Sequence, residues 1–285
     1  MDQIEIPLGD AEFARIRARV QREAGIALSE AKRQLVVSRL SRLVRGLGLP
    51  HFAAYLDHLD LGAGPQDRQA FINALTTNLT RFFREEHHFD HLVAHVGALM
   101  SHAPRRSPDG RPRLRLWSAG CSTGQEPYTM AMALLAAHPG LRNWDFRILA
   151  TDVDTDVLAR AASGRYAGSE IDGLSPQRKA MFLEDGDGQV RVPPAAQGLV
   201  TFKPLNLMDA WPMRGPFDAI FCRNVVIYFD KPTQMALFSR MVPMLVPGGC
   251  LYIGHSETLP AGELGLTSVG RTIFTMSAGP GRRAA

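Results

Sequence analysis

The sequence predicts an α/β fold, in which an all-helical N-terminal domain precedes a doubly wound, mostly parallel β-sheet of the Rossmann-like type. Three observations support this prediction. Apolar residues recur at helical spacing over roughly the first hundred positions, and after that point short apolar runs alternate with helical stretches. Between the two patterns, residues 101–112 are rich in proline and arginine, which is typical of a domain boundary.

The composition is that of one or two ordinary globular domains. The chain has 285 residues, of which 45% are hydrophobic, and it carries 32 Lys and Arg residues against 28 Asp and Glu residues. This balance excludes a disordered or fibrous protein, and a net charge of +4 does not by itself indicate nucleic-acid binding. No apolar stretch approaches the roughly 18 residues of a spanning helix, and the first residues have neither the basic segment nor the apolar core that is typical of a secretory signal. We therefore expect a cytoplasmic protein without direct membrane insertion.

The helical domain is assigned to residues 1–99. Phe13, Ile16 and Val20 begin the periodic pattern, which continues to about residue 99. Glycine and proline at 46–50 and 61–65 are expected to end helices. Residues 100–112 then form a linker, residues 113–278 a second domain and residues 279–285 a tail.

Four apolar runs predict buried parallel strands, and two helical stretches predict crossover helices. The strands are residues 114–120, 146–152, 217–224 and 250–255, and the helices are residues 126–138 and 233–245. Residues 176–207 differ, because they alternate and turn at Gly and Pro, which predicts a small antiparallel β excursion from the sheet.

Ligands of doubly wound sheets bind beyond the carboxyl ends of the strands. Gly120 and Gly124 lie there, in a turn that either brings backbone close to a nucleotide-like ligand or only joins a strand to a helix. Asp152 ends the second strand, where a carboxylate can accept hydrogen bonds from both ribose hydroxyls, whereas Asp154 is better placed to cap the next helix. Because neither GxGxxG nor GxxxxGK[ST] occurs, we expect an adenosine without a pyrophosphate.

Five blocks follow one another along the chain: NALTTNLTRFFRE (73–85), WSAGCSTGQEPYTMA (117–131), ATDVDTDVL (150–158), GPFDAIFCRNVVIYFD (215–230) and GHSE (254–257). Together they resemble the CheR family of chemotaxis receptor methyltransferases, over about residues 11–276. The resemblance implies the fold of S-adenosylmethionine-dependent methyltransferases. It also implies methyl transfer from S-adenosylmethionine to glutamate side chains on receptor signalling helices, with S-adenosylhomocysteine as the product.

The resemblance further implies a set of site residues. Arg84 and Tyr228 are expected at the reacting centre, with Arg84 near the sulfonium and the incoming carboxylate. An acidic pocket suits a cationic sulfonium. The residues expected to bind the cofactor are Asn78, Thr80, Arg84, Gly120, Glu126, Asp152, Asn206, Leu207, Arg223 and Asn224.

Other reactive residue types have simpler interpretations. Cys121 and Cys222 fall near the expected site but lack a nucleophile motif, so we interpret them as small buried hydrophobes. His87, His91 and His95 share one helical face, but without an HExxH motif we expect packing or exposure there and no metal site. Three cysteines without CxxC spacing indicate neither a disulfide framework nor a zinc site.

A basic stripe lies on the first helices. Arg39, Arg42 and Arg45 recur every third residue, away from the apolar face. A solvated face and a nucleic-acid site are open alternatives, whereas the resemblance implies contact with the acidic methylatable region of the receptor. The RNVVIY block lacks the prolines that shape a pocket for a flipped base, which favours a protein carboxylate. The rival functions are a basic nucleic-acid methyltransferase and a cofactor-binding adaptor without turnover.

In some family members the β excursion resembles a docking platform for a pentapeptide at the flexible receptor C-terminus. Here the turn is short and carries Glu184, Asp185 and Asp187. An acidic turn should repel an acidic peptide, and a short hairpin leaves less edge for strand addition. We therefore expect recognition through the methylation region alone, by a cytoplasmic monomer that is recruited to membrane receptor arrays.

Overall fold

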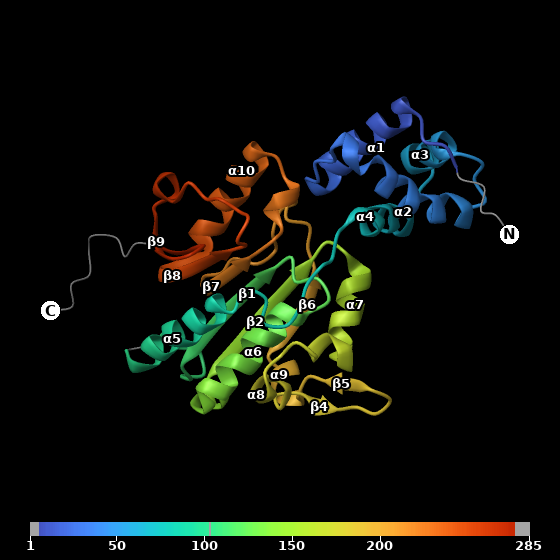
Figure 1. The fold of residues 1–285 in the computed structure, drawn as a ribbon. Coiled ribbons are helices and arrows are strands. Elements are labelled where there is room, and N and C mark those ends of the chain that lie inside the picture. Colours follow the sequence, from blue (N-terminus) through green and yellow to red (C-terminus); the bar gives the residue numbers. More distant parts are fainter. Residues whose placement is uncertain (1–5, 103, 277–285) are drawn as a thin grey trace.

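A computed structural model describes residues 6–102 and 104–276 of the chain (Figure 1). The helical domain has one apolar core, to which Phe13, Val36, Tyr55 and Phe71 contribute from four different helices. The predicted helix ends at 46–50 and 61–65 are confirmed. The helices are α1 (Asp10–Ala24), α2 (Arg33–Gly46), α3 (Phe52–Leu61) and α4 (Pro65–Leu75), with a short turn η1 (Glu30–Lys32).

The remainder of the chain is built on a seven-stranded sheet in the order β6-β2-β1-β7-β8-β10-β9. The first five of these strands are parallel, and β10 and β9 are antiparallel to their neighbours. This confirms the predicted mostly parallel sheet. Its strands are β1 (Arg113–Ala119), β2 (Asp145–Asp152), β6 (Val200–Pro204), β7 (Phe217–Cys222), β8 (Leu245–Ile253), β9 (Leu266–Gly270) and β10 (Ile273–Met276).

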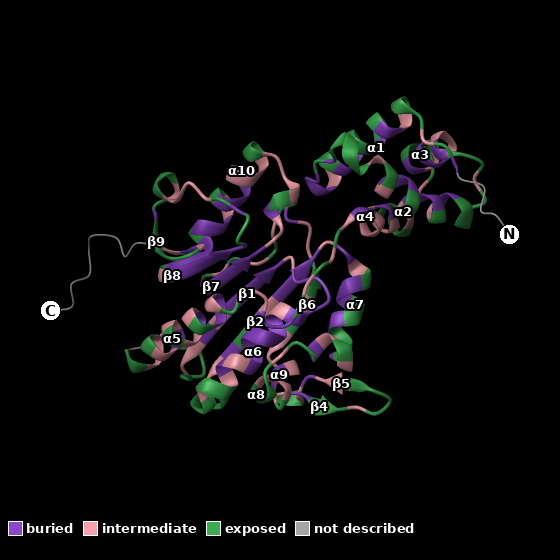
Figure 2. Ribbon diagram, viewed as in Figure 1, coloured by how far each residue is buried: buried purple, intermediate pink, exposed green. Residues whose placement is uncertain are grey.

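Helices cover both faces of this sheet. Phe221 and Tyr252 pack on the side of α5 and α6, whereas the alternate residues Ile220 and Leu251 pack on the side of α10. All of β7 is therefore buried, as Figure 2 shows in purple. The helices are α5 (His87–Ser101), α6 (Gln125–Ala137), α7 (Thr155–Ser163) and α10 (Lys231–Met241).

Helix α5 packs on the sheet and not with the helical domain. Its Phe89, Leu92 and Val96 join the core that contains Tyr128 of α6 and Phe146 of β2. The predicted end of the helical domain at residue 99 therefore differs from the packing, in which that domain's core ends with α4. Helical periodicity does not tell which core an apolar stripe covers. The predicted tail, residues 279–285, lies outside the described residues.

The antiparallel excursion exists, but its bounds differ from the predicted 176–207. Strands β3 (Arg165–Ala167), β5 (Gln189–Arg191) and β4 (Leu183–Glu184) form a small sheet in that order, whereas β6 pairs with β2 in the main sheet. The short helices α8 (Pro176–Lys179) and α9 (Pro194–Gln197) complete this region. In β6 the apolar residues Val200 and Phe202 alternate with Thr201 and Lys203. Such an alternation fits either a strand of an antiparallel excursion or an edge strand of the main sheet, so the sequence could not assign β6.

The turn of this small sheet is less acidic than its sequence indicates. Oδ2 of Asp185 lies 2.7 Å from Nε of Arg165, and Oδ1 lies 3.9 Å from Nε of Arg191. Two arginines therefore flank Asp185, and Glu184 and Asp187 are left as the exposed acids of the turn. The electrostatic argument against an acidic peptide is weakened, whereas the shortness of the hairpin stands.

Polar contacts tie the helical domain to the carboxyl edge of the sheet. Gln69 of α4 donates to the carbonyl of Val153 at 2.7 Å, and the backbone N–H of Ala27 donates to the carbonyl of Tyr228 at 2.8 Å. The helical domain thus lies over the edge where sheets of this kind bind ligands (Figure 1). None of the helices described in either region is long and apolar enough to cross a membrane.

Candidate cofactor site

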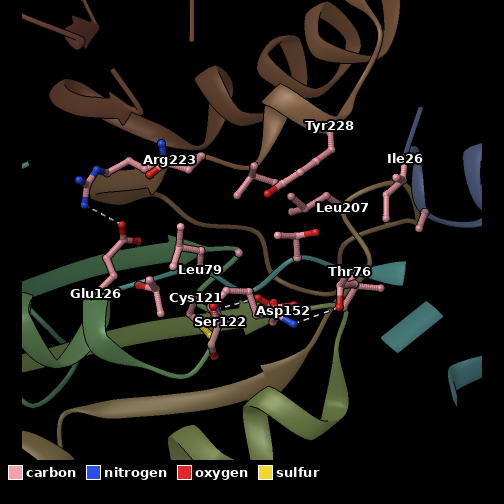
Figure 3. Close-up of a pocket in the computed structure, with 18 of the residues that line it drawn as sticks. Ile26, Thr76, Leu79, Cys121, Ser122, Glu126, Asp152, Leu207, Arg223 and Tyr228 are labelled. Atoms are coloured by element: carbon pink, nitrogen blue, oxygen red, sulfur yellow. Dashed lines mark hydrogen bonds and ion pairs between the residues drawn. The ribbon is translucent and has the colours of Figure 1, made fainter. Parts of the chain in front are cut away.

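A pocket that is open to solvent lies between the carboxyl ends of β1, β2 and β7 and the helical domain (Figure 3). Every residue predicted for the cofactor or the reaction lines this pocket. They are Asn78, Thr80, Arg84, Gly120, Glu126, Asp152, Asn206, Leu207, Arg223, Asn224 and Tyr228.

The turn after β1 and the end of β2 form one wall. Gly120 has a φ of +80°, and a Cβ there would lie 2.4 Å from Cγ2 of Val225, so both backbone and space require glycine. The two carboxylate oxygens of Asp152 accept from the backbone N–H groups of Ser122 at 2.7 Å and Asp154 at 3.0 Å. Burial raises the pKa of Asp152 to about 6, and these hydrogen bonds oppose the shift.

Asp154 has two roles, of which the sequence predicted one. Its Oδ1 caps α7, as predicted, by accepting from the backbone N–H groups of Asp156 and Val157. Its Oδ2 accepts from Nδ2 of Asn78 at 2.8 Å and from Oγ1 of Thr76 at 2.6 Å. The segment after α4 is thereby fixed against the turn after β2.

Two residues in the left-handed region flank Arg84. Phe83 has a φ of +54° and Glu85 a φ of +59°, which is uncommon for side chains of this size and requires firm surroundings. The ring of Phe83 lies 4.3 Å from the guanidinium carbon of Arg178. Nη1 of Arg84 donates to the carbonyl of Leu79 at 2.8 Å, so the side chain folds back along the pocket wall.

Glu126 and Arg223 form a buried ion pair in the pocket (Figure 3). Nη1 of Arg223 lies 2.9 Å from Oε2 of Glu126, and Oγ of Ser118 donates to Oε1 at 2.7 Å. Burial raises the pKa of Glu126, and the positive charge of Arg223 opposes that shift. Arg223 also donates to the carbonyl of Arg84, which joins the ion pair to the segment after α4.

The turn after β7 carries Asn224 and Tyr228. Glu257 holds this turn, because its Oε1 accepts from the backbone N–H groups of Val225 at 2.9 Å and Val226 at 3.0 Å. Glu257 belongs to the GHSE block, which therefore supports the pocket without lining it. The sequence showed that block only as part of a resemblance.

The opposite wall is apolar and includes part of the helical domain. Leu207 is buried here, and Ile26 lines the pocket beside it. Asn206 ties this wall to α1, since its Nδ2 donates to the carbonyl of Glu23 at 2.5 Å and its Oδ1 accepts from the backbone N–H of Met208 at 3.0 Å. Both ends of the amide are thus engaged within the chain.

These residues fit S-adenosylmethionine. The buried carboxylate of Asp152 at the end of the second strand offers acceptors for ribose hydroxyls, and Leu207 with Ile26 offers an apolar surface for adenine. Asp152 and Glu126 are the acidic groups of a lining that also contains Arg81, Arg84 and Arg223, and a sulfonium would favour the side of the pocket with the carboxylates.

Comparison with known proteins agrees with this geometry. The all-alpha domain of CheR methyltransferases matches residues 11–76, and their SAM-binding domain matches residues 78–274. The chain belongs to the CheR methyltransferase family. The family and fold class predicted from the sequence are confirmed, and the protein is an S-adenosylmethionine-dependent methyltransferase. The two matched ranges meet directly after α4, in agreement with the packing of α5 on the sheet.

Relatives within the CheR family match almost the whole chain. The chain is 44% identical over 280 residues to the chemotaxis protein methyltransferase of Escherichia coli, a match that covers 95% of this chain and 93% of that protein. It is also 44% identical over 271 residues to chemotaxis protein methyltransferase 2 of Pseudomonas aeruginosa, covering 93% and 92% of the two chains.

In this CheR family member only two of the three arginines of the predicted basic stripe are exposed. Arg39 donates from Nη1 to the carbonyls of Ala74, at 3.3 Å, and Thr76, so it caps the end of α4. Arg42 and Arg45 are exposed. A spacing of three residues does not distinguish an arginine that points to solvent from one that reaches a neighbouring helix.

The predicted site cysteines are buried thiols, and two of the three histidines on one face of α5 are engaged in hydrogen bonds. Burial raises the pKa of the Cys121 and Cys222 thiols well above its usual range, which is unfavourable for a thiolate nucleophile. Nδ1 of His91 lies 2.9 Å from the hydroxyl of Tyr252, and Nε2 of His87 lies 3.1 Å from the carbonyl of Arg271. Within residues 6–102 and 104–276, no group of His, Cys, Asp and Glu is placed to hold a metal ion.

Proposed function

We propose that this protein transfers the methyl group of S-adenosylmethionine to glutamate side chains on the cytoplasmic signalling helices of chemotaxis receptors. The products are glutamate methyl esters and S-adenosylhomocysteine. The observation that carries the proposal is the meeting of Asp152, Glu126, Arg84 and Tyr228 in one pocket beneath the helical domain. The chemotaxis names of the relatives support the receptor as the substrate.

S-adenosylmethionine supplies an electrophilic methyl group on a positively charged sulfur. Within the pocket, Asp152 would accept hydrogen bonds from the ribose hydroxyls, Leu207 would contact the adenine, and Glu126 would lie near the methionine portion. A glutamate carboxylate is already ionised at neutral pH, so the chain needs no strong general base.

The contribution of the chain to the reaction is placement. Holding the carboxylate oxygen about 3 Å from the methyl carbon and in line with the sulfur can supply several kcal/mol of barrier reduction. Arg84 orients the incoming carboxylate, and Tyr228 lines the opening on the other side. Exclusion of water by the helical domain keeps the carboxylate reactive.

The receptor is recognised through the helical domain. Arg42 and Arg45 of α2 are exposed and meet the acidic methylatable region by charge complementarity. The protein acts in the cytoplasm as a monomer, is recruited to membrane receptor arrays by this contact, and needs no C-terminal pentapeptide tether.

A methyl-transfer assay on the purified receptor tests this function. S-adenosylmethionine with a labelled methyl group is incubated with the protein and with receptor signalling fragments, DNA or RNA. We expect label on the receptor that is released as methanol by mild base, as glutamate methyl esters require. Label on nucleic acid would support the nucleic-acid methyltransferase, and cofactor binding without transfer would support the adaptor.

A further inference from the structure

Arg81 lines the pocket, but neither the cofactor nor the reaction as proposed makes use of it. Of the other arginines in the lining, Arg223 is paired with Glu126 at 2.9 Å, and Arg84 donates to the carbonyl of Leu79 at 2.8 Å. Among the described residues, none forms a hydrogen bond or an ion pair with the guanidinium group of Arg81. Arg81 is also exposed, so its charge lies at the mouth of the pocket.

The electrostatic surroundings leave the charge of Arg81 available to a partner. The acid that it acts on is Glu86, and Glu86 is already paired with Arg178 at 2.6 Å. The hydrogen bond from Arg178 is the main reason why the pKa of Glu86 is lowered, and the charge of Arg81 adds to that effect. A guanidinium group stays protonated in proteins, so Arg81 is a permanent cation. Such a cation at the mouth of a pocket attracts an anionic partner.

The chain holds the backbone of Arg81 in place from both sides. Before it, Asn78 is hydrogen-bonded to the turn after β2. After it, the buried ring of Phe82 packs edge to face against Tyr166 and Phe182, with ring centroids 4.8 Å apart in both pairs. Because the backbone is already ordered, a partner that binds the guanidinium group has little backbone entropy to remove.

An exposed apolar side chain accompanies this charge. Leu79 lines the pocket two residues before Arg81 and is 79% exposed (Figure 3). Covering a leucine of this exposure is favourable, because it removes apolar surface from water. A small anion would match the charge alone. A helix can present an apolar side chain and a carboxylate within one turn, so it can match both Leu79 and Arg81.

We propose that Arg81 is a specificity-determining residue that binds a second acidic side chain of the receptor, within one helical turn of the glutamate that is methylated. The methylated glutamate enters the pocket at Arg84, and Arg81 meets its acidic neighbour at the mouth. The inference rests on the proposed function, because it takes a receptor helix as the substrate. It narrows the substrate class to helices on which the acceptor glutamate is accompanied by another carboxylate. Replacing that carboxylate by an amide removes its charge and should weaken recognition.

Steady-state kinetics of Arg81→Gln test the proposal, with a chemotaxis receptor signalling fragment that the unmodified protein methylates. The contact is made equally in the bound state and the transition state, so its loss should raise KM for the fragment about 3- to 10-fold and change kcat by less than about 2-fold. The affinity for S-adenosylmethionine, measured by calorimetry, should stay unchanged.

The matched control is Arg142→Gln, which should change neither kinetic constant nor the affinity. Arg142 is an exposed arginine that does not line the pocket. It belongs to the short helix η2 (Pro139–Asn143), which precedes β2 and so lies at the opposite edge of the sheet.

Substitutions in the fragment identify the partner of Arg81. Each acidic residue within about four positions of the acceptor glutamate is replaced by its amide, one at a time. One of these changes should raise KM for the unmodified protein by the same factor and should have no further effect in Arg81→Gln. Arg81→Glu should regain a normal KM when a lysine stands at that position of the fragment.

Three outcomes would overturn the proposal. An unchanged KM in Arg81→Gln would show that Arg81 is only a solvated arginine, and additive effects of the two substitutions would show that the two residues do not meet. A weakened affinity for S-adenosylmethionine would show that Arg81 holds the carboxylate of the cofactor. Absence of receptor methylation by the unmodified protein would instead count against the proposed function.

Discussion

Replacing Asp152 by Asn should separate cofactor affinity from the stability of the ligand-free protein. The change preserves shape and removes the charge. If the carboxylate holds the ribose, binding loses the advantage of a charged acceptor, which is worth roughly 1 to 3 kcal/mol or about 5- to 150-fold in affinity. Asp156→Asn is the matched control, because Asp156 is exposed in the first turn of α7 and does not line the pocket.

The same substitution should not lower the free energy of unfolding of the ligand-free protein at neutral pH. Burial raises the pKa of Asp152 from 3.8 to about 6, so the native state binds this proton more tightly than the unfolded state. The contribution of Asp152 to the free energy of unfolding therefore falls as the pH rises from about 4 to about 6 and is constant above that range. Two pKa units correspond to roughly 3 kcal/mol, which the native protein carries as a cost at neutral pH.

The Asn variant avoids the cost of the buried charge. It also loses the acceptor for one backbone N–H, that of Ser122 or Asp154, which lowers the free energy of unfolding by about 1 to 3 kcal/mol. The free energy of unfolding at neutral pH should therefore equal that of the unmodified protein or exceed it by up to roughly 2 kcal/mol. Urea unfolding measures this, and calorimetry measures the affinity.

The pH dependence gives an independent check. Cofactor affinity of the unmodified protein should fall as the pH decreases through about 6, because a protonated Asp152 accepts fewer hydrogen bonds, whereas the Asn variant should not show this step. Full affinity in Asp152→Asn, or a cofactor affinity that does not change across this range, would refute the reasoning.

Three further predictions concern the reaction and the receptor. Arg84→Ala should reduce turnover on the order of 100-fold through misplacement of the carboxylate, with a thermal unfolding midpoint close to normal, and normal turnover would exclude Arg84 from the reacting centre. The double variant Arg42→Glu, Arg45→Glu should lower kcat/KM for the receptor on the order of tenfold, because the new charges repel an acidic partner, while cofactor affinity stays unchanged. Arg39 is left intact because it caps α4. Normal methylation by the double variant would show that these two arginines are only a solvated face. Titration with an acidic receptor-type C-terminal pentapeptide should show no low-micromolar binding, because β4, at the edge of the small sheet, has two residues; tight binding that is abolished by disrupting the small sheet would refute the absence of a tether.

The strand ends could be predicted from the sequence because buried parallel strands leave a local signal. Asp152 and Gly120 follow apolar runs, and parallel strands place their carboxyl ends at one edge of the sheet. Arg84, Asn206 and Tyr228 have no such signal, and only the resemblance placed them. The structure brings them to the same pocket from three separate parts of the chain.

The errors have a common physical cause, which is that local patterns do not contain the partner of an element. Arg39 has the spacing of a solvated arginine, yet it reaches the end of α4. The stripe of α5 has the same period whether it covers a helical core or a sheet. The sequence alone indicates that Asp185 is an exposed acid, but in the structure it pairs with Arg165, which lies twenty positions earlier in the chain.

The segment that carries Arg84 shows how far this dependence reaches. Arg39 of α2 binds the carbonyl of Thr76 at one end of it, and Asp154 binds the side chains of Thr76 and Asn78. At the other end of the segment, the guanidinium group of Arg178, in α8 next to the small sheet, packs on the ring of Phe83. Arg223, which follows β7, donates a hydrogen bond to the carbonyl of Arg84. The helical domain, the main sheet and the small sheet therefore all position one side chain. A segment held from four directions can keep two large residues in the left-handed conformation, which no local sequence preference would select. The orientation of Arg84 is thus a property of the assembled domains, and if Arg84 acts as proposed, a change in any one of them should be measurable as a change in turnover.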